Sequence, residues 1–282
     1  MLRDINIVFL DIPTAIQGPT SPNTWKVRCA PKICLLHVID SLMHKRRLAL
    51  NYKKIPYTTE WVPTADIKST CIKYGIPPSG TRPNGEPHYT LPALIDHTNP
   101  DYPVILSDSI PIIEYLEKTY PSPPERRLLP DGTTPLQLLF TEFVLPKILS
   151  FVPSLAIMAF YRSKTPRDQA DFRSRTEAAY GKKLEEIEKQ GPEREAAYKE
   201  SEELFGKLVT AWRKNENHPF IMGERPTLAD LAVAAILIFF KLISPNELWV
   251  RVSGWDDAFW LRYLNAFSDW MNVDNHPDFL VY

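Results

Sequence analysis

The chain of 282 residues is poor in cysteine, which excludes several classes of protein. Its three cysteines, Cys29, Cys34 and Cys71, are too few for a disulfide framework or a cysteine-rich zinc site. No Cys-x-x-Cys motif occurs, which argues against a disulfide oxidoreductase. His37 and His44 lie in one segment, but no third type of ligand accompanies them, so we predict no metal site. This composition fits a reducing cytosol.

The chain also lacks an excess of either charge and any long apolar run. Its formal net charge is −1 at pH 7, so no bulk field favours nucleic acid or a membrane surface. No apolar run reaches the roughly 20 residues that a membrane helix needs. The N-terminal residues 1–13 are too acidic for a secretory signal, and residues 5–11 predict a buried strand instead.

The length and the 44% of hydrophobic residues suit two domains with real cores. Residues 1–120 predict the order strand, helix, strand, helix, strand, strand, helix, which is a thioredoxin-like α/β domain. Residues 121–135 are rich in proline and predict a linker. Residues 136–282 predict an all-helical domain. A turn-rich loop at residues 76–88 fits either a lip over a site or plain disorder.

The stretch of residues 86–120 predicts a strand, a turn, a second strand and a helix. Pro92 lies inside the first of these predicted strands, where proline is unusual. A cis Leu91–Pro92 bond would resolve this conflict and would leave the Leu91 N–H and C=O pointing outward, available to an extended peptide. A plain edge strand fits these residues equally well.

The helix after the second strand begins at Asp108-Ser109, with Pro111 in its first turn. A hydroxyl and free N–H groups at a helix start suit a bound anion. Ser21-Pro22 predicts a second helix start, after a loop from the first strand. The helix dipole there would favour a bound thiolate. Each serine also fits the simpler role of a helix cap.

The helical half carries two apolar segments with open interpretations. Gln137–Arg162 contains Pro146 and Pro153, which predict a kinked or split helix. Its apolar side chains fit a substrate wall or a core, and the aromatic-dense C-terminal segment fits either role too. The wall candidates are Phe151, Pro153, Met158, Phe160 and Tyr161. Thr227 and Asp230 predict a capping box before a buried central helix.

Three motifs together resemble the glutathione S-transferase superfamily. They are Tyr-Thr-Leu-Pro-Ala-Leu with the following Ser-Asp-Ser, the Gly-x-x-x-Thr-x-x-Asp box ending at Asp230, and Ser-Pro-Asn-Thr-Trp-Lys from Ser21. The last is most similar to serine-type, etherase-like transferases of fungi. The resemblance covers most of the chain. It implies a thioredoxin-like glutathione-binding domain followed by the all-helical domain of this superfamily.

The resemblance also implies site residues. Ser21 takes the catalytic position, and glutathione as co-substrate is bound by Asn23, Leu91, Pro92, Asp108 and Ser109. Thr24 is a nearby polar alternative to Ser21. The expected reaction is attack of the glutathione thiolate on an apolar, aromatic electrophile, such as an aryl ether, in a homodimeric detoxification enzyme. The alternatives are a ligandin-like protein of the same fold that binds aromatic ligands without turnover, and a protein-interaction role.

One segment departs from the family pattern. The segment of residues 28–46 is additional to the family pattern and makes this part of the chain longer than the resemblance allows. Within it, Pro31 would break the helix that starts after Ser21. A second helix from about residue 33 to residue 53 is then expected. We hypothesise that the segment is a retained intron, and a mature transcript that keeps these codons would refute this. The competing interpretation is a genuine insertion.

Overall fold

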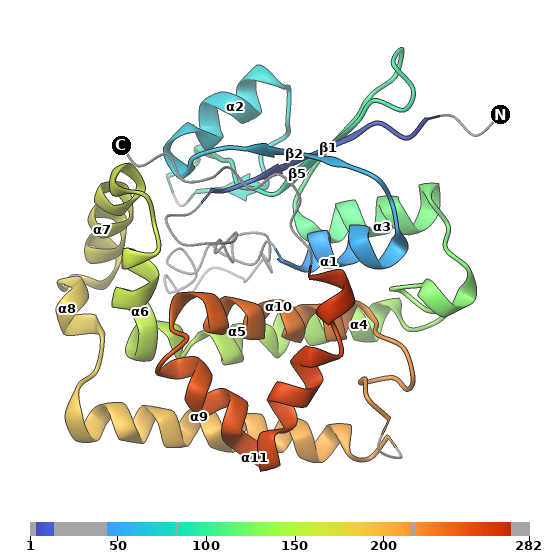
Figure 1. Cartoon of the computed structure of the whole chain (residues 1–282). Helices are drawn as coiled ribbons and strands as arrows, with labels where there is room; N and C mark the ends of the chain where they lie inside the picture. Colours follow the sequence, from blue (N-terminus) through green and yellow to red (C-terminus); the bar gives the residue numbers. More distant parts are fainter. Residues whose placement is uncertain (1–3, 14–43, 83, 216–217, 272–282) are drawn as a thin grey trace.

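The computed structural model describes residues 4–13, 44–82, 84–215 and 218–271 (Figure 1). A small sheet with its helices lies against a larger helical body, and this is the predicted fold class. The strands are β1 (Ile7–Asp11), β2 (Thr58–Trp61), β3 (Gly80–Thr81), β4 (Pro87–His88), β5 (Ala93–Asp96) and β6 (Val104–Ser107). The α-helices are α1 (His44–Lys53), α2 (Ile67–Lys73), α3 (Ser109–Thr119), α4 (Thr134–Phe143), α5 (Leu145–Leu149), α6 (Val152–Arg162), α7 (Pro166–Tyr180), α8 (Leu184–Ile187), α9 (Gly191–Trp212), α10 (Leu228–Ile243) and α11 (Leu248–Asn265). Short 3-10 turns are η2 (Thr64–Asp66), η3 (Pro124–Arg126) and η4 (Ser268–Trp270).

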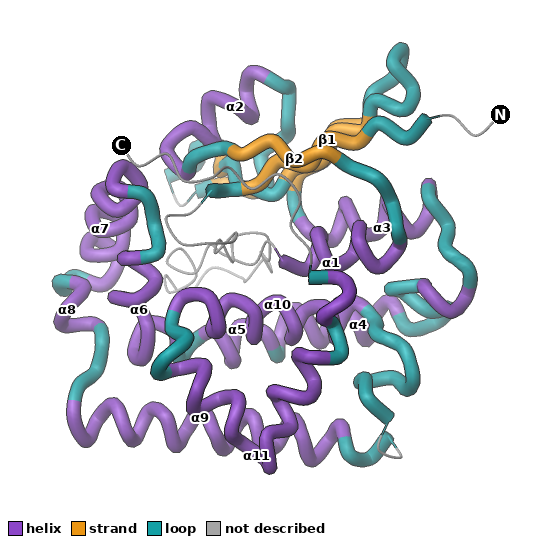
Figure 2. The backbone as a smooth tube through the Cα atoms, viewed as in Figure 1, coloured by secondary structure: helices purple, strands orange, loops and turns teal. Residues whose placement is uncertain are grey.

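The main sheet has the strand order β2-β1-β5-β6. β1 runs parallel to β2 and antiparallel to β5, which in turn pairs antiparallel with β6. Side chains alternate along β1, so Ile7 and Phe9 pack with α1 and α3, whereas Leu10 packs with α2. Figure 2 shows the sheet between α2 on one side and α1 and α3 on the other. This is the thioredoxin-like arrangement.

Helix α1 joins the two halves of the molecule. Leu50 packs in the cluster under the sheet, together with residues of β1 and α3. Leu48, Ala49 and Tyr52 pack in the large cluster of the helical half. The predicted second helix therefore exists from His44 onward, and the part of that prediction before residue 44 lies outside the described residues.

Helix α10 is the centre of the helical half, as its apolar sequence predicted. Nearly all of its side chains are buried, including Asp230. Thr227 and Asp230 form the predicted reciprocal cap at its start. The predicted split of Gln137–Arg162 is also confirmed, because the segment forms α4, α5 and α6 with Pro146 and Pro153 in first turns.

A second contact between the halves lies at η2 and α7. The Arg167 guanidinium donates two hydrogen bonds of 2.8 and 2.9 Å to the Asp66 carboxylate. The buried Asp168 accepts a hydrogen bond of 3.2 Å from the Ala65 N–H. The sheet domain is therefore held to the helical domain both through α1 and through this contact.

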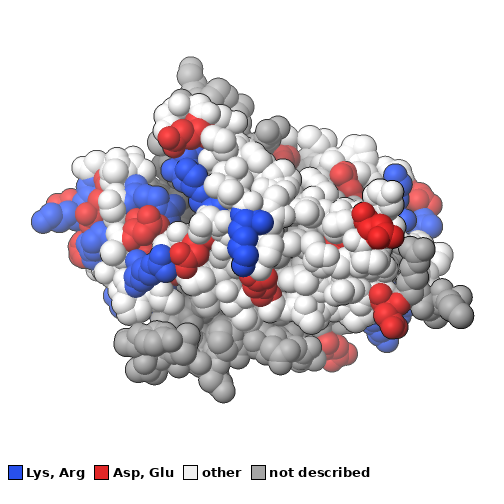
Figure 3. Space-filling view, turned by 90° about the horizontal axis from the view of Figure 1, so that it is seen from above, with Lys and Arg blue, Asp and Glu red and all other residues white. Residues whose placement is uncertain are grey.

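Helix α7 and its neighbours carry mixed charges. Arg173 pairs with Glu177 and Glu185, and Arg175 pairs with Asp171. Figure 3 shows Lys and Arg next to Asp and Glu at the end of the molecule where α7 lies. Opposite charges neutralise one another there, so this surface offers no basic patch for nucleic acid.

Several expectations need correction. The segment of residues 76–88 is not structureless, because β3 and β4 form a small antiparallel sheet around a turn at Gly85, whose φ is +85°. Pro92 precedes β5 and does not lie within a strand. Of the two roles left open for the apolar side chains of Gln137–Arg162, the core role is observed, since Pro153 and Phe160 are buried and Phe151, Met158 and Tyr161 pack against the large core cluster. Most of the C-terminal aromatic residues are core as well.

No single helix of the described chain is long and apolar enough to cross a membrane, although the bent pair Thr134–Leu149 and Val152–Arg162 passes a test of length and composition. Among the same residues, no group of three His, Cys, Asp or Glu side chains is arranged to hold a metal ion.

Candidate functional site

The Leu91–Pro92 peptide bond is cis, which confirms the prediction from the sequence. Ala93, the next residue, starts β5 and pairs with Ser107 at the end of β6. The Asp108 N–H donates a 3.3 Å hydrogen bond to the Pro92 carbonyl. The antiparallel pairing thus brings the proline turn directly beside the start of α3.

Leu91 is fully buried. Its main chain lacks the hydrogen bonds that a paired strand makes to its neighbour. Neither its N–H nor its C=O makes a hydrogen bond to a described residue. A buried main-chain polar group without a partner is unfavourable, and a ligand with an extended main chain would supply both partners. The expected donor and acceptor are therefore present, although they are not on the surface as the sequence suggested.

Asp108 is the N-cap of α3, with a φ of +74°. Its carboxylate accepts hydrogen bonds from the Ser109 N–H and, at 3.3 Å, from the Ser109 hydroxyl. A left-handed conformation at a residue other than glycine is strained and is common at ligand sites. The position predicted for a bound anion is thus occupied here by the chain's own carboxylate.

Glu142 on α4 faces this corner from the helical half. Burial raises the pKa of the half-buried Glu142 carboxyl, and the negative charge of Asp108 raises it further. Two carboxylates that approach one another suit a cation between them. Sequence reasoning missed Glu142, because no local pattern connects α4 with the start of α3.

Cys71 is the free cysteine of the described residues, and it is buried in α2. Burial raises the pKa of its thiol to about 11. A thiol with such a pKa is protonated at neutral pH and is a poor nucleophile. The nucleophile of a reaction here must therefore come from elsewhere.

Of the remaining sequence candidates, Ser21, Asn23 and Thr24 lie outside the described residues. Their roles stay predictions from the sequence. The structure brings Leu91, Pro92, Asp108 and Ser109 together at one corner of the sheet domain, and it adds Glu142 from α4.

Comparison with protein families gives two matches. The profile described as "Glutathione S-transferase, N-terminal domain" matches residues 42–119, and "Glutathione S-transferase, C-terminal domain" matches residues 135–270. A curated relative, the glutathione S-transferase-like protein ustS of Aspergillus flavus, is 28% identical over 236 residues, which are 80% of this chain and 83% of that protein.

Solved structures of two fungal proteins are similar over nearly the whole chain. Glutathione transferase GSTFuA3 of Phanerochaete chrysosporium has 30% identity and a TM-score of 0.79, over 95% of this chain and 98% of that one. Glutathione S-transferase CsGST63524 of Ceriporiopsis subvermispora, solved in complex with glutathione, has 31% identity and a TM-score of 0.79, over 95% and 99%.

Proposed function

The chain belongs to the glutathione S-transferase family, and from this membership we propose that it joins glutathione to an apolar, aromatic electrophile. The observation that carries the proposal is the cis Leu91–Pro92 bond beside the Asp108-Ser109 start of α3. We propose the boundaries 1–120 for the glutathione-binding domain, 121–135 for the linker and 136–282 for the helical domain, in a protein of the reducing cytosol.

Glutathione fits the chemistry of this corner group by group. The Leu91 N–H and C=O would pair with the cysteinyl main chain of the tripeptide. The γ-glutamyl end carries a carboxylate and an ammonium. The carboxylate suits the Ser109 hydroxyl and the first-turn N–H groups, once Asp108 releases them. The ammonium suits the two carboxylates of Asp108 and Glu142, because the negative charge of Asp108 already acts on the Glu142 carboxyl and raises its pKa.

The proposed chemistry is nucleophilic displacement by sulfur. Ser21 would donate a hydrogen bond to the glutathione sulfur, and the thiol proton leaves to solvent. The thiolate forms a C–S bond at the electrophilic carbon, and the leaving group departs with the electron pair of the broken bond. In an aryl ether the broken bond is C–O, and the oxygen that leaves takes up a proton from water. A serine hydroxyl orients and stabilises the thiolate and is not a base.

Calorimetry of glutathione binding tests the proposal. We expect the chain to bind glutathione and Ser109→Ala to weaken binding about 10-fold, because one hydrogen bond to a charged group is lost. Ser253→Ala removes an equivalent hydroxyl from a partly exposed position on α11 and should leave the affinity unchanged. A wild-type chain that does not bind glutathione would refute the assignment of this corner.

The same titration, repeated across acid pH, tests Glu142. The raised pKa of Glu142 means that its carboxylate forms only as the pH rises above the ordinary value of 4.5. An ammonium favours the carboxylate form, so the affinity for glutathione should rise with pH in this range and level off when Glu142 is ionised. Glu142→Gln should remove the rise. An identical rise in wild type and variant would exclude Glu142 from the site.

We also propose a homodimer through α4. Leu136, Leu139 and Phe143 are 66%, 52% and 64% exposed and follow one face of this helix. No other described helix exposes as many large apolar side chains. A contiguous apolar stripe of this kind favours burial against another molecule, and a second copy provides the same stripe in an isologous contact.

Light scattering after gel filtration tests the dimer. The wild type should have about twice the chain mass of 32.4 kDa, and Phe143→Glu should give the monomer mass, because a charge in the middle of an apolar contact is strongly unfavourable. Ile72→Glu places the same charge at a similarly exposed position on α2 and should leave the dimer intact. A dimer that survives Phe143→Glu would exclude α4 as the interface.

A further inference from the structure

Some serine and threonine residues of the chain are followed directly by proline, and the structure separates them by their surroundings. They are Ser21, Ser122, Thr134, Thr165 and Ser244, of which all but Ser21 lie in the described residues. Thr134 is the first residue of α4. Thr165 caps α7, because its hydroxyl accepts a hydrogen bond of 3.3 Å from the Asp168 N–H. Ser244 is buried at the end of α10, where its hydroxyl accepts from the Leu248 N–H. These three hydroxyls thus belong to helices or their caps.

Ser122 lies instead in the short irregular segment between α3 and η3, on the outside of the molecule (Figure 1). Ser122 itself is half-buried, and the exposed residues on its two sides are Pro121, Pro123, Pro124 and Glu125. Pro123 has φ −51° and ψ 151°, an extended conformation of the polyproline type. A protein kinase places the acceptor hydroxyl against its catalytic aspartate, so the residues around that hydroxyl must be accessible and extended. Among the described pairs, Ser122-Pro123 suits a kinase that requires proline after the acceptor.

A buried ammonium group lies against the Ser122 hydroxyl. The Lys53 Nζ donates a hydrogen bond of 2.8 Å to the Ser122 Oγ and pairs with the Glu117 carboxylate at 2.6 Å. An ammonium has three donors, and the third donor of Lys53 bonds to no described residue. The Lys53 side chain is 0% exposed, so its charge is little screened by water. A phosphate on Ser122 would therefore meet a positive charge at the place where the hydroxyl already bonds.

A second cation lies close by in the sequence. Arg126 follows Ser122 by four residues, and its buried Nε has no hydrogen-bond partner among the described residues. Arg127 pairs with the Asp131 carboxylate, so Arg126 is the arginine of η3 with a donor to spare. Charge-assisted hydrogen bonds from a guanidinium are a common way to bind a phosphate group.

We propose that Ser122 is a phosphorylation site for a proline-directed protein kinase and that Lys53 binds the phosphate. The Ser122 oxygen attacks the γ-phosphorus of ATP and forms an O–P bond. The bond from that phosphorus to the bridging oxygen breaks, ADP leaves with the electron pair, and the hydroxyl proton passes to the aspartate of the kinase. The phosphate brings roughly two negative charges to a buried ammonium. It would thus fasten the start of the linker to the end of α1 more strongly than the hydroxyl does.

Phosphorylation of the purified whole chain tests the site. The chain is incubated with ATP and either a mitogen-activated or a cyclin-dependent kinase, and mass spectrometry of its peptides locates the phosphate. We expect phosphate on Ser122 with at least one of the two kinases. Ser122→Ala should abolish its incorporation because the acceptor is missing, and Pro123→Ala because the kinase requires that proline. Thr134→Ala removes the hydroxyl of another Thr-Pro pair and should leave the incorporation unchanged. Phosphate on other residues only, or none with either kinase, would overturn the proposal.

A phosphorus NMR titration of the phosphorylated chain tests the role of Lys53 without replacing this buried residue. The second pKa of phosphoserine is ordinarily about 6. In the folded chain we expect it to be lower by about one unit, because a neighbouring ammonium favours the dianion. In urea the contact with Lys53 is lost, so the value should return to about 6. An equal pKa in the folded and the unfolded chain would exclude Lys53 as the phosphate ligand. Failure of the chain to bind glutathione would overturn the proposed function and leave this site standing.

Discussion

Replacement of Asp230 by alanine is expected to lower the free energy of unfolding by about 3–5 kcal/mol, the largest stability effect we predict. The Asp230 carboxylate is fully buried at the start of α10. It accepts hydrogen bonds from the Ile221 N–H at 2.7 Å, from the N–H and hydroxyl of Thr227 at 2.8 and 2.7 Å, and from the Tyr263 hydroxyl at 2.9 Å. Alanine would leave these buried donors without an acceptor.

Urea denaturation measures this effect. Asp230→Asn keeps the shape and one acceptor oxygen, so its loss should be smaller than that of alanine. Glu202→Ala, an exposed acidic position on α9, should change stability by less than about 0.5 kcal/mol. If Asp230→Ala behaved like Glu202→Ala, the cap would be dispensable and the start of α10 would be stabilised by packing alone.

Replacement of Ser21 by alanine is expected to lower kcat/KM toward an aryl electrophile about 100-fold, the largest effect on activity. The expectation rests on the sequence position of Ser21 and on the need to stabilise a thiolate at neutral pH. Glutathione affinity should change little, because the remaining contacts come from Leu91, Asp108 and Ser109. The pH at which kcat/KM rises should shift upward, since the thiol would lose its stabilising donor.

Thr24→Ala is the control for this experiment, because Thr24 offers a hydroxyl three residues further along the chain. If Ser21→Ala retains full activity while Thr24→Ala loses it, the donor is Thr24. If neither variant changes turnover, the thiolate is stabilised by another group, and the serine-type assignment is wrong.

The parts of the fold that local sequence signals determine were predictable. Pro92 at a strand start indicated the cis bond, and Thr227 with Asp230 indicated the cap of α10. Pro146 and Pro153 indicated the breaks between α4, α5 and α6. Each of these features depends on a few neighbouring residues, and backbone restriction or a missing N–H decides the outcome locally.

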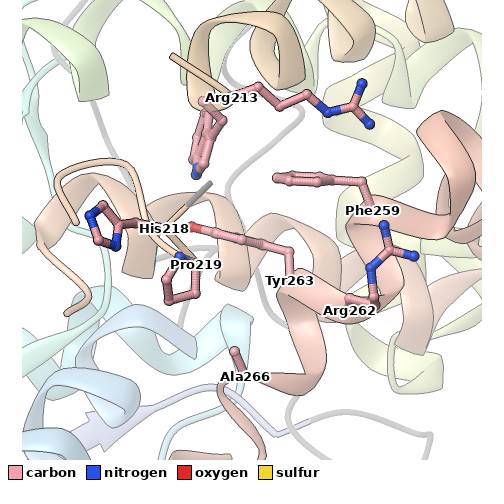
Figure 4. Close-up of a pocket in the computed structure, with 8 residues that line it drawn as sticks. Arg213, His218, Pro219, Phe259, Arg262, Tyr263 and Ala266 are labelled. Carbon is pink, nitrogen blue, oxygen red and sulfur yellow. The ribbon is translucent and has the colours of Figure 1, made fainter. Parts of the chain in front are cut away.

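The features that were missed depend on residues distant in the sequence. The charge of Asp108 acts on Glu142 only because the helical half packs against the sheet half. One pocket is lined by residues of α11, such as Phe259 and Arg262, together with Arg213 and His218 (Figure 4), because α11 returns to the end of α9. The β3–β4 sheet was missed for a different reason, since strands of two residues in a polar segment carry no periodic signal.

Helix α1 contributes side chains to the cores of both halves of the chain, so neither half can be exchanged without affecting the other. Leu50 fits a core built by residues 7–116, whereas Leu48, Ala49 and Tyr52 fit a core built by residues 113–267. A recombination event that replaced either half alone would place one face of α1 against a core whose side chains do not fit it. Substitutions in this helix must satisfy both cores at once, so replacing either half alone is expected to weaken the packing of the other half as well.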